Sequence, residues 1–262
     1  MNGAQLKAKI RSGTPIWGTM LVYARSLQAA AVYGQLGLDF AIVDAEHTPT
    51  GRSEAADMGA ALLAAGVCPV IRVPHTEPHA TIMALDAGFH GVLVPYCETA
   101  EEVRAVVSAA KWRPLKGALH SRARDTGAFP SEATRAYLEK RNANVVVIVG
   151  IESVPAIENL DAILDVEGVD AIFVGPNDLS VSLGIPDQYD HPRYVEAVEH
   201  VVTTAQQRGI PAGPHCFNEE QLVRWHGKGV RFVLFSADVR ALAEGYRTTL
   251  SKVRGGATEA SS

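Results

Sequence analysis

Acidic and imidazole side chains directly follow an apolar segment near the start of the chain. The segment FAIV, residues 40–43, runs straight into Asp44, Glu46 and His47. Carboxylates and imidazoles are costly to bury unless they are paired or bind something. The end of this apolar run is therefore a candidate functional site.

Similar groups stand at the ends of other apolar runs. They are Arg72, Glu152, Asn177, Asp178, His215, Ser236 and Asp238. The residues that precede the same runs are mostly the Gly, Asp, Pro and Asn of turns. This asymmetry indicates that the candidate functional residues cluster at the carboxyl ends of the apolar runs.

The residue types at these positions suit carbon-acid chemistry. Glu152 and Asp178 could hold one hard divalent cation through oxygen ligands and leave positions for water and substrate. Arg72 suits a substrate carboxylate or an enolate oxygen. His47 is the natural proton carrier near neutral pH, and the nearby Asp44 could fix its tautomer. Each residue also has a structural explanation, namely Glu152 as a helix cap, Asp178 as an Asx turn and His47 as a surface turn residue.

Eight short apolar runs would position these residues. The runs cover residues 16–22, 40–45, 69–73, 91–96, 145–151, 171–175, 210–215 and 231–235. Alanine-rich amphipathic segments alternate with them, and several end in the Gly expected just past a helix. Such a rhythm predicts βαβ units with parallel strands buried on both faces. The count and the length of 262 residues predict a single-domain α/β fold, a (β/α)8 TIM barrel over residues 1–254, with a doubly wound open sheet as the alternative.

In such a barrel the carboxyl ends of all strands meet at one face, where the loops build the active site. The candidate residues should converge there. Residues 111–144 form a longer and more polar connection between the fourth and fifth runs, and we interpret it as a functional loop or lid. The small, polar residues 255–262 are expected to be a disordered tail.

Composition and charge exclude several classes of partner. The net charge is -5 and the 24 basic residues are scattered, so no basic stripe for nucleic acid or an anionic membrane is expected. Neither an apolar leader nor a membrane-length apolar segment is present, and a cytoplasmic location is expected. Cys68, Cys97 and Cys216 are too few and too widely spaced for a disulfide framework or a zinc knuckle, so we expect them in the core.

Missing motifs narrow the class of cofactor. No Gly-x-Gly-x-x-Gly follows the first run and no Walker A pattern occurs, so neither a dinucleotide nor ATP is indicated. No lysine lies in or at the end of any of the eight runs, where a Schiff-base aldolase would need one. Metal activation is therefore favoured over imine chemistry.

Longer stretches carry a resemblance to a known family. The segments DFAIVDAEHTP, VIRVP, DAGFHGVLVPYCETAEEVRAVVSAAKWRP and IVGIESVPAIENLDAILDVEGVDAIFVGPNDLSVSLG are similar to those of the HpcH/HpaI family of class II, metal-dependent pyruvate aldolases. The resemblance implies a (β/α)8 barrel that assembles as a hexamer and binds Mg2+, Mn2+ or Co2+. It also implies reversible cleavage and formation of 4-hydroxy-2-oxo acids from pyruvate, or a substituted pyruvate such as hydroxypyruvate, and an aldehyde through a metal-bound enolate.

The resemblance assigns roles by matching position. Glu152 and Asp178 become metal ligands, and Arg72 stabilises the enolate. His47 and Asp44 form a base dyad that acts through a metal-bound water. Glu46 holds that water or the imidazole from behind.

Further residues are expected to contact substrate. Those in the GPN segment are Gly175, Pro176 and Asn177. His215 points by pattern toward the same face, with a hydrogen-bonded core histidine as the alternative. Arg122 and Arg124 in the long connection could recognise a distal carboxylate or a polyol, with solvated surface charge as the alternative.

The chain departs from the family pattern at a few positions. Relatives commonly carry Gln where this chain has Gly150, an Arg-Gly pair where it has Lys116 and Gly117, and in some cases Trp where it has Met20. These changes bear on substrate identity and leave the metal and base positions intact.

Two other functions fit the same resemblance less well. An acyl-CoA lyase of the citrate lyase β type would share the Glu, Asp and Arg positions, but it would need a basic site for the nucleotide, and no such cluster is visible. A non-catalytic barrel is disfavoured because the ligand set is complete.

Overall fold

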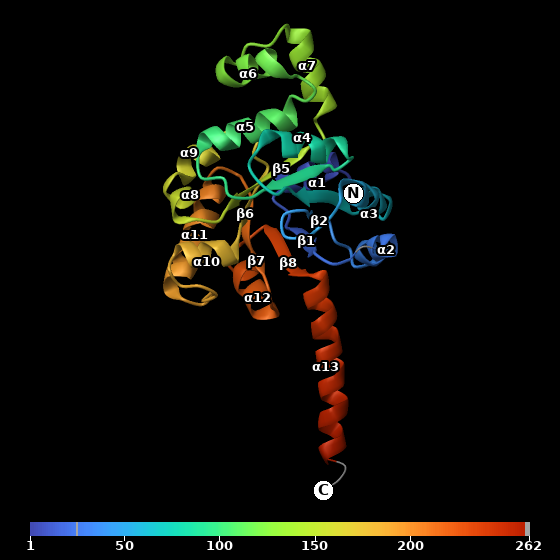
Figure 1. Cartoon of the computed structure of the whole chain (residues 1–262). Helices are drawn as coiled ribbons and strands as arrows, with labels where there is room; N and C mark the ends of the chain where they lie inside the picture. Colours follow the sequence, from blue (N-terminus) through green and yellow to red (C-terminus); the bar gives the residue numbers. More distant parts are fainter. Residues whose placement is uncertain (25, 260–262) are drawn as a thin grey trace.

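The computed structural model, which describes residues 1–24 and 26–259, is a closed barrel of eight parallel strands (Figure 1). The strands are β1 (Ile16–Leu21), β2 (Phe40–Asp44), β3 (Cys68–Arg72), β4 (Gly91–Val94), β5 (Val146–Ile151), β6 (Ala171–Val174), β7 (Ala212–Cys216) and β8 (Phe232–Ala237). Each strand pairs with its neighbours in chain order, and β8 closes onto β1. The predicted (β/α)8 barrel is confirmed, and the open sheet is wrong.

Helices follow the strands and wrap the barrel (Figure 1). They are α1 (Gly3–Arg11), α2 (Leu27–Gln35), α3 (Arg52–Ala64), α4 (Pro78–Asp86), α5 (Ala100–Lys111), α6 (Gly117–Thr126), α7 (Glu132–Arg141), α8 (Val154–Glu158), α9 (Leu160–Leu164), α10 (Pro176–Ser182), α11 (Pro192–Gln207), α12 (Glu219–Gly227) and α13 (Asp238–Glu259). Local sequence sets several of their ends. The Thr99 side chain accepts from the Glu102 N–H in a capping box that starts α5, and Gly127 in the left-handed region ends α6.

Two apolar layers stabilise the barrel. Along β2, Phe40 and Ile42 belong to the cluster inside the barrel, whereas Ala41 and Val43 pack in the outer cluster between strands and helices. This alternation is the pleat of a strand that is buried on both faces. Leu6 of α1 joins the inner cluster, so this short helix closes the amino-terminal end of the barrel. The three cysteines are buried and free, as predicted.

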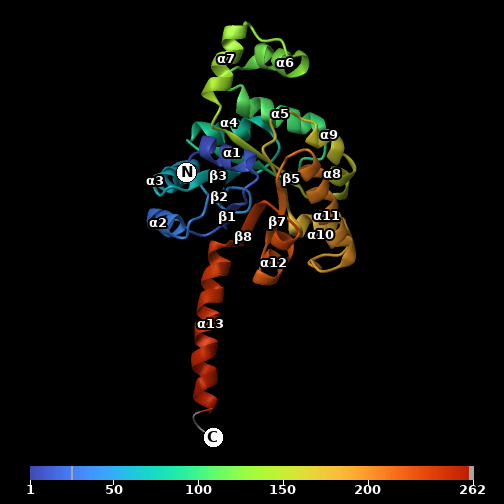
Figure 2. The same ribbon diagram turned by 180° about the vertical axis from the view of Figure 1, so that it is seen from behind.

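The connection over residues 111–144 is not a loop over the strand ends. It contains α6 and α7, which form a helical hairpin outside α5, on the far side of that helix from the strands (Figure 2). Asn142 ties the hairpin to the barrel by donating from Nδ2 to the carbonyls of Lys111 at 2.8 Å and Arg113 at 2.7 Å. Because the hairpin leaves from the end of α5 and returns to the start of β5, it lies away from the carboxyl ends of the strands. The expected lid is therefore absent from this segment.

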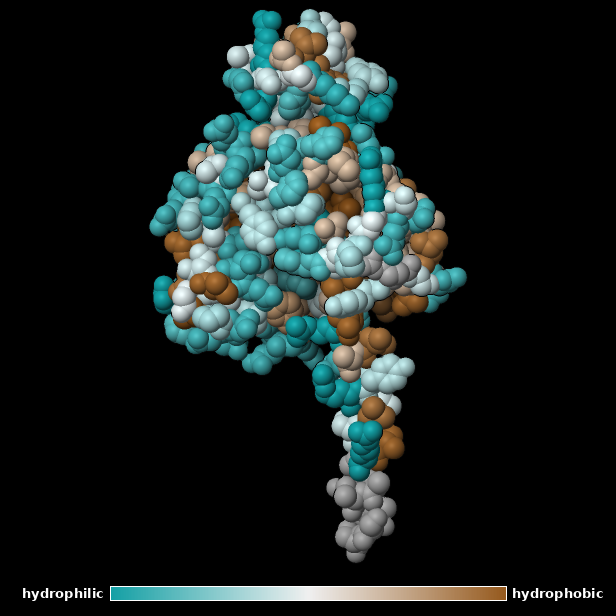
Figure 3. All heavy atoms as spheres, viewed as in Figure 1, coloured by the Kyte–Doolittle hydropathy of each residue, from teal (hydrophilic) through white to brown (hydrophobic). Residues whose placement is uncertain are grey.

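The last helix, α13, leaves the barrel after β8 and projects away from it (Figure 1). Five of its apolar side chains are exposed and are spaced three or four residues apart. They are Val239, Leu242, Tyr246, Leu250 and Val253. Figure 3 shows apolar residues along the visible face of this helix, uncovered by the rest of the described chain. The helix continues past the predicted boundary at residue 254 to Glu259, and residues 260–262 of the predicted tail lie outside the described residues. Within the described ranges, no helix combines the length and the apolar composition needed to cross a membrane.

Candidate active site

The strand pairing brings Asp44 and Arg72 together. The two residues are register partners at the carboxyl ends of β2 and β3. Arg72 donates from Nε to Asp44 Oδ1 at 3.0 Å and from Nη2 to Oδ2 at 2.8 Å, and both side chains are buried. Burial alone would raise the pKa of Asp44, but the hydrogen bonds and charge of Arg72 leave it below its usual value. Asp44 is thus an ionised anchor that fixes the guanidinium in a fork geometry.

Glu46 adds a second carboxylate to the same guanidinium. Its Oε2 lies 3.1 Å from Arg72 Nε, and its Oε1 lies 3.5 Å from His47 Nε2. The Glu46 side chain is only 6% exposed, yet neither oxygen receives a hydrogen bond of good geometry from the part of the chain that the structure describes. A buried carboxylate with unfilled acceptor positions is suited to a ligand, a cation or water.

The imidazole of His47 is oriented differently from the prediction. Asp44 Oδ1 accepts the main-chain N–H groups of Glu46 at 3.0 Å and His47 at 3.4 Å, and Arg72 occupies the rest of the carboxylate. The side chain next to the imidazole is that of Glu46. The expected Asp44–His47 dyad is therefore replaced by a Glu46–His47 contact. The His47 side chain is 55% exposed and can exchange protons with solvent.

Glu152 is a second deeply buried acid of the site. It follows β5 directly, is 3% exposed and accepts the Tyr96 N–H at 2.9 Å through Oε2. Burial raises the pKa of Glu152 to about 7, and the charges of Asp178 and Glu46 add to the rise. The close backbone packing depends on Gly175, because a Cβ at that position would lie 2.2 Å from Glu152 Oε1.

Asp178 comes from the neighbouring strand end. It stands in the first turn of α10, which starts directly after β6 with Gly175 as the N-cap, and it is partly exposed. Burial is the main cause that raises the pKa values of Glu152 and Tyr96, and the charge of Asp178 adds to both rises. Glu152 and Asp178 thus follow the neighbouring strands β5 and β6, and Glu46 follows β2 at the same end of the barrel.

This donor set fits a hard divalent cation. Asp44 and Glu46 share the single guanidinium of Arg72, and within the described residues neither Glu152 nor Asp178 forms an ion pair. Glu152 and Asp178 would be the ligands. Among the described residues no cluster of three or more His, Cys, Asp or Glu side chains has metal-binding spacing. The remaining positions of a cation would therefore go to water and substrate oxygens.

The predicted substrate contacts divide into two groups. Gly175 lies against Glu152, and Pro176 is buried at the first position of α10. Asn177 is exposed, and its Oδ1 accepts a hydrogen bond from the Tyr189 hydroxyl at 2.6 Å. Gly150 also approaches Glu152, because a Cβ there would lie 3.2 Å from the carboxylate.

His215 is buried behind the site. Its Nε2 lies 2.8 Å from the Ser236 carbonyl, which makes it a hydrogen-bonded histidine of the barrel wall. Burial lowers the pKa of His215 to about 4, with the charges of Arg72 and Arg240 acting in the same direction. The ring is therefore neutral at physiological pH. Asp238 is structural, since its carboxylate accepts main-chain N–H groups of residues 22–24 after β1.

Arg122 and Arg124 do not join these residues. Both lie on α6 in the hairpin outside α5, and Arg124 pairs with the adjacent Asp125 at 2.7 Å. In this chain both side chains are solvated surface charges, which is the alternative to substrate recognition that the sequence left open.

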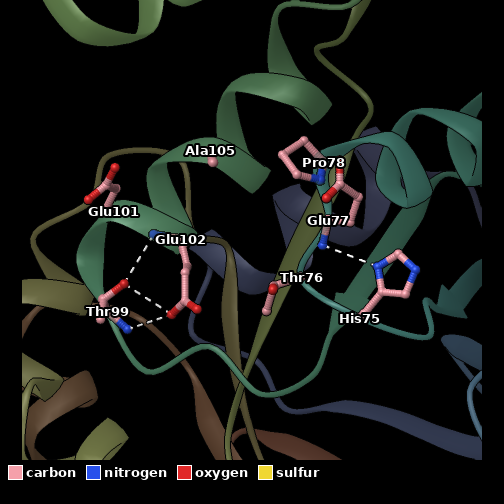
Figure 4. Close-up of a pocket in the computed structure, with 8 residues that line it drawn as sticks. All are labelled: His75, Thr76, Glu77, Pro78, Thr99, Glu101, Glu102 and Ala105. Atoms are coloured by element: carbon pink, nitrogen blue, oxygen red, sulfur yellow. Dashed lines mark hydrogen bonds between the residues drawn. The ribbon is translucent and has the colours of Figure 1, made fainter.

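One cleft of the described chain does not contain the predicted site residues. It measures about 690 Å3 and lies between the loop after β3 and the start of α5 (Figure 4). Two of its polar side chains are already engaged. Glu102 Oε2 accepts the Thr99 N–H at 3.0 Å, and His75 Nδ1 accepts the Glu77 N–H at 3.3 Å. We therefore assign the chemistry to the strand ends and not to this cleft.

Sequence reasoning missed three residues of the site. Tyr96 closes the predicted run at residues 91–96, and its φ of 56° is in the left-handed region, uncommon for a residue with a side chain. Tyr189 and Phe217 lie in the loops that precede α11 and follow β7. An aromatic residue just after a strand end was the only available signal, and it applied to Tyr96 and Phe217.

Comparisons with known proteins agree with this geometry. A sequence model of the family described as HpcH/HpaI aldolase/citrate lyase matches residues 20–243. The 5-keto-4-deoxy-D-glucarate aldolase of Salmonella paratyphi A is 35% identical over 213 residues, covering 80% of this chain and 81% of that protein. An HpcH/HpaI aldolase/citrate lyase family protein from Burkholderia cenocepacia J2315 has a TM-score of 0.83 and 31% identity, covering 96% of this chain and 99% of that one. An HpcH/HpaI aldolase from Desulfitobacterium hafniense DCB-2 has a TM-score of 0.81 and 30% identity, covering 95% and 96% of the two chains.

The fold and the site thus define a parallel barrel with carboxylates and one arginine gathered at its strand ends. The chain belongs to the HpcH/HpaI aldolase/citrate lyase family. The family resemblance predicted from the sequence motifs is confirmed.

Proposed function

We propose that the protein is an aldolase that reversibly cleaves a 4-hydroxy-2-oxo acid into an aldehyde and pyruvate, or a substituted pyruvate such as hydroxypyruvate. The observation that carries the proposal is the buried Glu152 after β5, with Asp178 after the neighbouring β6 and the fixed guanidinium of Arg72 at the same end of the barrel. Membership of the family and the names of its relatives support a carbon–carbon lyase. The relative from Salmonella paratyphi A is named for 5-keto-4-deoxy-D-glucarate, an oxo derivative of a sugar diacid.

Glu152 and Asp178 would hold a divalent cation, Mg2+, Mn2+ or Co2+. When bound, the cation supplies positive charge that polarises the 2-oxo group of the substrate. The buried and crowded Glu152 supports this role, because a carboxylate whose pKa is raised to about 7 gains stability from a neighbouring cation.

The other residues would handle charge and protons. Arg72, fixed by Asp44 and Glu46, presents a permanent positive charge to the oxygen on which the enolate develops. His47 Nε2 takes the proton from the C4 hydroxyl during cleavage and returns it during addition. Glu46 orients this imidazole in place of the expected Asp44.

Carbon–carbon bond formation tests the proposal directly. Pyruvate and hydroxypyruvate would each be incubated with a panel of aldehydes in the presence of Mg2+, Mn2+ or Co2+, and products would be identified by mass spectrometry and proton NMR. We expect 4-hydroxy-2-oxo acids to form with the wild-type protein and not with Asp178→Asn. If no combination yields product with folded wild-type protein, the proposal is wrong.

We also propose that the protein forms a homo-oligomer, and the predicted hexamer stays a prediction. The support is the apolar stripe of α13, whose Leu242 is 61% exposed and Tyr246 is 65% exposed. The barrel carries uncovered apolar side chains too, including Leu27, Val32 and Leu36 on and beside α2. Burial of both sets against a second copy would remove apolar surface from water.

A further inference from the structure

Arg240 is a basic side chain at the strand-end face that the mechanism above does not use. It lies in the first turn of α13, directly after β8. Its guanidinium carbon sits 4.5 Å from the centroid of the Phe217 ring. No carboxylate within residues 1–24 and 26–254 forms an ion pair with it. Stacking on an aromatic face orients a guanidinium while leaving its N–H donors available.

A continuous wall of side chains leads from Arg240 to the candidate metal ligands. The Phe217 ring lies 4.9 Å from the His215 ring and 5.5 Å from the Tyr189 ring. Tyr189 in turn donates to Asn177, the residue before Asp178. The loops after β6, β7 and β8 thus bring Arg240 to the rim of the same site.

The charge of Arg240 acts on this wall. Burial lowers the pKa of His215, and the charges of Arg72 and Arg240 act in the same direction. Burial, Asp187 and Asp178 raise the pKa of Tyr189, and the charge of Arg240 opposes this rise. The two arginines therefore act on His215 together, but they are not equivalent. Arg72 is already bound by Asp44 and Glu46, whereas Arg240 retains its hydrogen-bonding capacity.

We propose that Arg240 determines specificity by binding the carboxylate of an acidic aldehyde, at the end of the substrate remote from the pyruvate part. This inference rests on the proposed aldolase function and narrows its aldehyde to the class of aldehydic acids. A guanidinium fork matches a carboxylate with two parallel hydrogen bonds. Asn177 and Tyr189 line the path between the two ends and offer polar contacts for hydroxyl groups of the aldehyde.

The role assigned here to Arg240 is the one that the sequence suggested for Arg122 and Arg124. Those residues lie outside α5, and Arg124 is engaged with Asp125. The sequence did not indicate Arg240 as a site residue, because it lies on a helix several residues past the end of the predicted eighth run.

The test compares two aldehydes of equal chain length, succinic semialdehyde and butanal, in addition to pyruvate. The measured quantity is the ratio of their kcat/KM values. We expect the wild-type enzyme to favour succinic semialdehyde, and Arg240→Gln to lower the ratio by about 10- to 100-fold, the range for loss of charge-assisted hydrogen bonds. Arg247→Gln is the matched control, because Arg247 lies on the same helix, is exposed and pairs with Glu244.

The outcomes separate this inference from the proposed function. An unchanged ratio in Arg240→Gln, or an equal fall in Arg247→Gln, would overturn the role of Arg240 while leaving the aldolase proposal intact. A wild-type protein that exchanges pyruvate methyl protons with deuterated solvent but shows no preference between the two aldehydes would also overturn it. A wild-type protein that neither exchanges these protons nor forms product would contradict the aldolase function and this inference with it.

Discussion

At the scale of single residues, Arg72 is the best-fixed group of the site. Two carboxylates hold its guanidinium, which makes it a preorganised positive charge for an enolate oxygen. Lysine keeps the charge but cannot reproduce the fork with Asp44. We expect Arg72→Lys to lower kcat/KM for aldol cleavage by about 10²- to 10³-fold. Arg208→Lys, at an exposed ion pair with Asp161, is the control, and near-normal kinetics of Arg72→Lys would remove the residue from the mechanism.

Substitution of His47 can distinguish a role in proton transfer from a role in substrate binding. If its imidazole moves the C4 hydroxyl proton, His47→Ala should lower kcat by about 10²- to 10⁴-fold with little change in the affinity for pyruvate. Steady-state kinetics and calorimetric pyruvate titration measure the two quantities. His79→Ala, at an exposed position of α4, provides the control. A variant at position 47 that keeps its kcat would show that the base lies elsewhere.

Residue types could be predicted from the sequence more reliably than their partners. Asp44 and Glu152 were correctly placed at strand ends because an acid after an apolar run is visible in one dimension. The partner of Asp44 depends on the register of β2 against β3, which pairs it with Arg72 and leaves the imidazole to Glu46. The sequence does not display that register. The structure therefore differs from the predicted contact between Asp44 and the imidazole of His47, and places Glu46 beside the imidazole instead.

At the scale of elements, the turn between β6 and α10 makes room for Glu152. A methyl group at Gly175 would meet Glu152 Oε1 at 2.2 Å and displace the carboxylate. We expect Gly175→Ala to weaken Mn2+ binding by about 10- to 100-fold in calorimetric titration, the range seen when the support of a ligand is disturbed.

Gly227→Ala is the matched control for this turn. No atom lies within 4 Å of the added Cβ, and Gly227 is helical, so alanine should raise stability by about 0.5 to 1 kcal/mol without changing Mn2+ binding. Equal Mn2+ affinity of Gly175→Ala and wild type would mean that Glu152 is not a ligand in the position described.

All eight strands could be predicted because each coincides with a short, largely apolar run that is mostly buried. The hairpin of α6 and α7 could not, because only Ala123 and Leu138 of these two helices are buried. A helix with so little apolar surface leaves almost no periodic signal. Its sequence therefore resembled a polar loop.

At the scale of the whole molecule, α13 packs on the barrel through its first turn and then exposes an apolar stripe. If its stripe contacts a second copy, a charge at its centre should dissociate the assembly. We expect Leu242→Lys to shift the wild-type oligomer toward smaller species in sedimentation velocity at equal protein concentration. Thr248→Lys, off the stripe on the same helix, should leave the distribution unchanged. A wild-type protein that is monomeric at micromolar concentration would contradict the proposed assembly.

The barrel itself followed from the sequence, but the course of α13 did not. An apolar stripe on a helix indicates that something covers it, and the same stripe would suit a helix folded back onto its own barrel. The apolar stripe looks the same in the sequence whether the helix projects from the barrel or packs against it. The sequence alone therefore does not predict which of the two arrangements forms.

In the proposed mechanism, Glu152 and Asp178 hold a divalent cation that activates pyruvate beside Arg72. Exchange of the pyruvate methyl protons with deuterated solvent, followed by proton NMR, tests it most directly because no aldehyde is needed. We predict that exhaustive chelation abolishes the exchange and that Mg2+, Mn2+ or Co2+ restores it in the wild type but not in Glu152→Gln. Exchange that continues at the full rate in the chelated enzyme, or that returns equally in Glu152→Gln, would contradict the role of the cation and of Glu152 as its ligand.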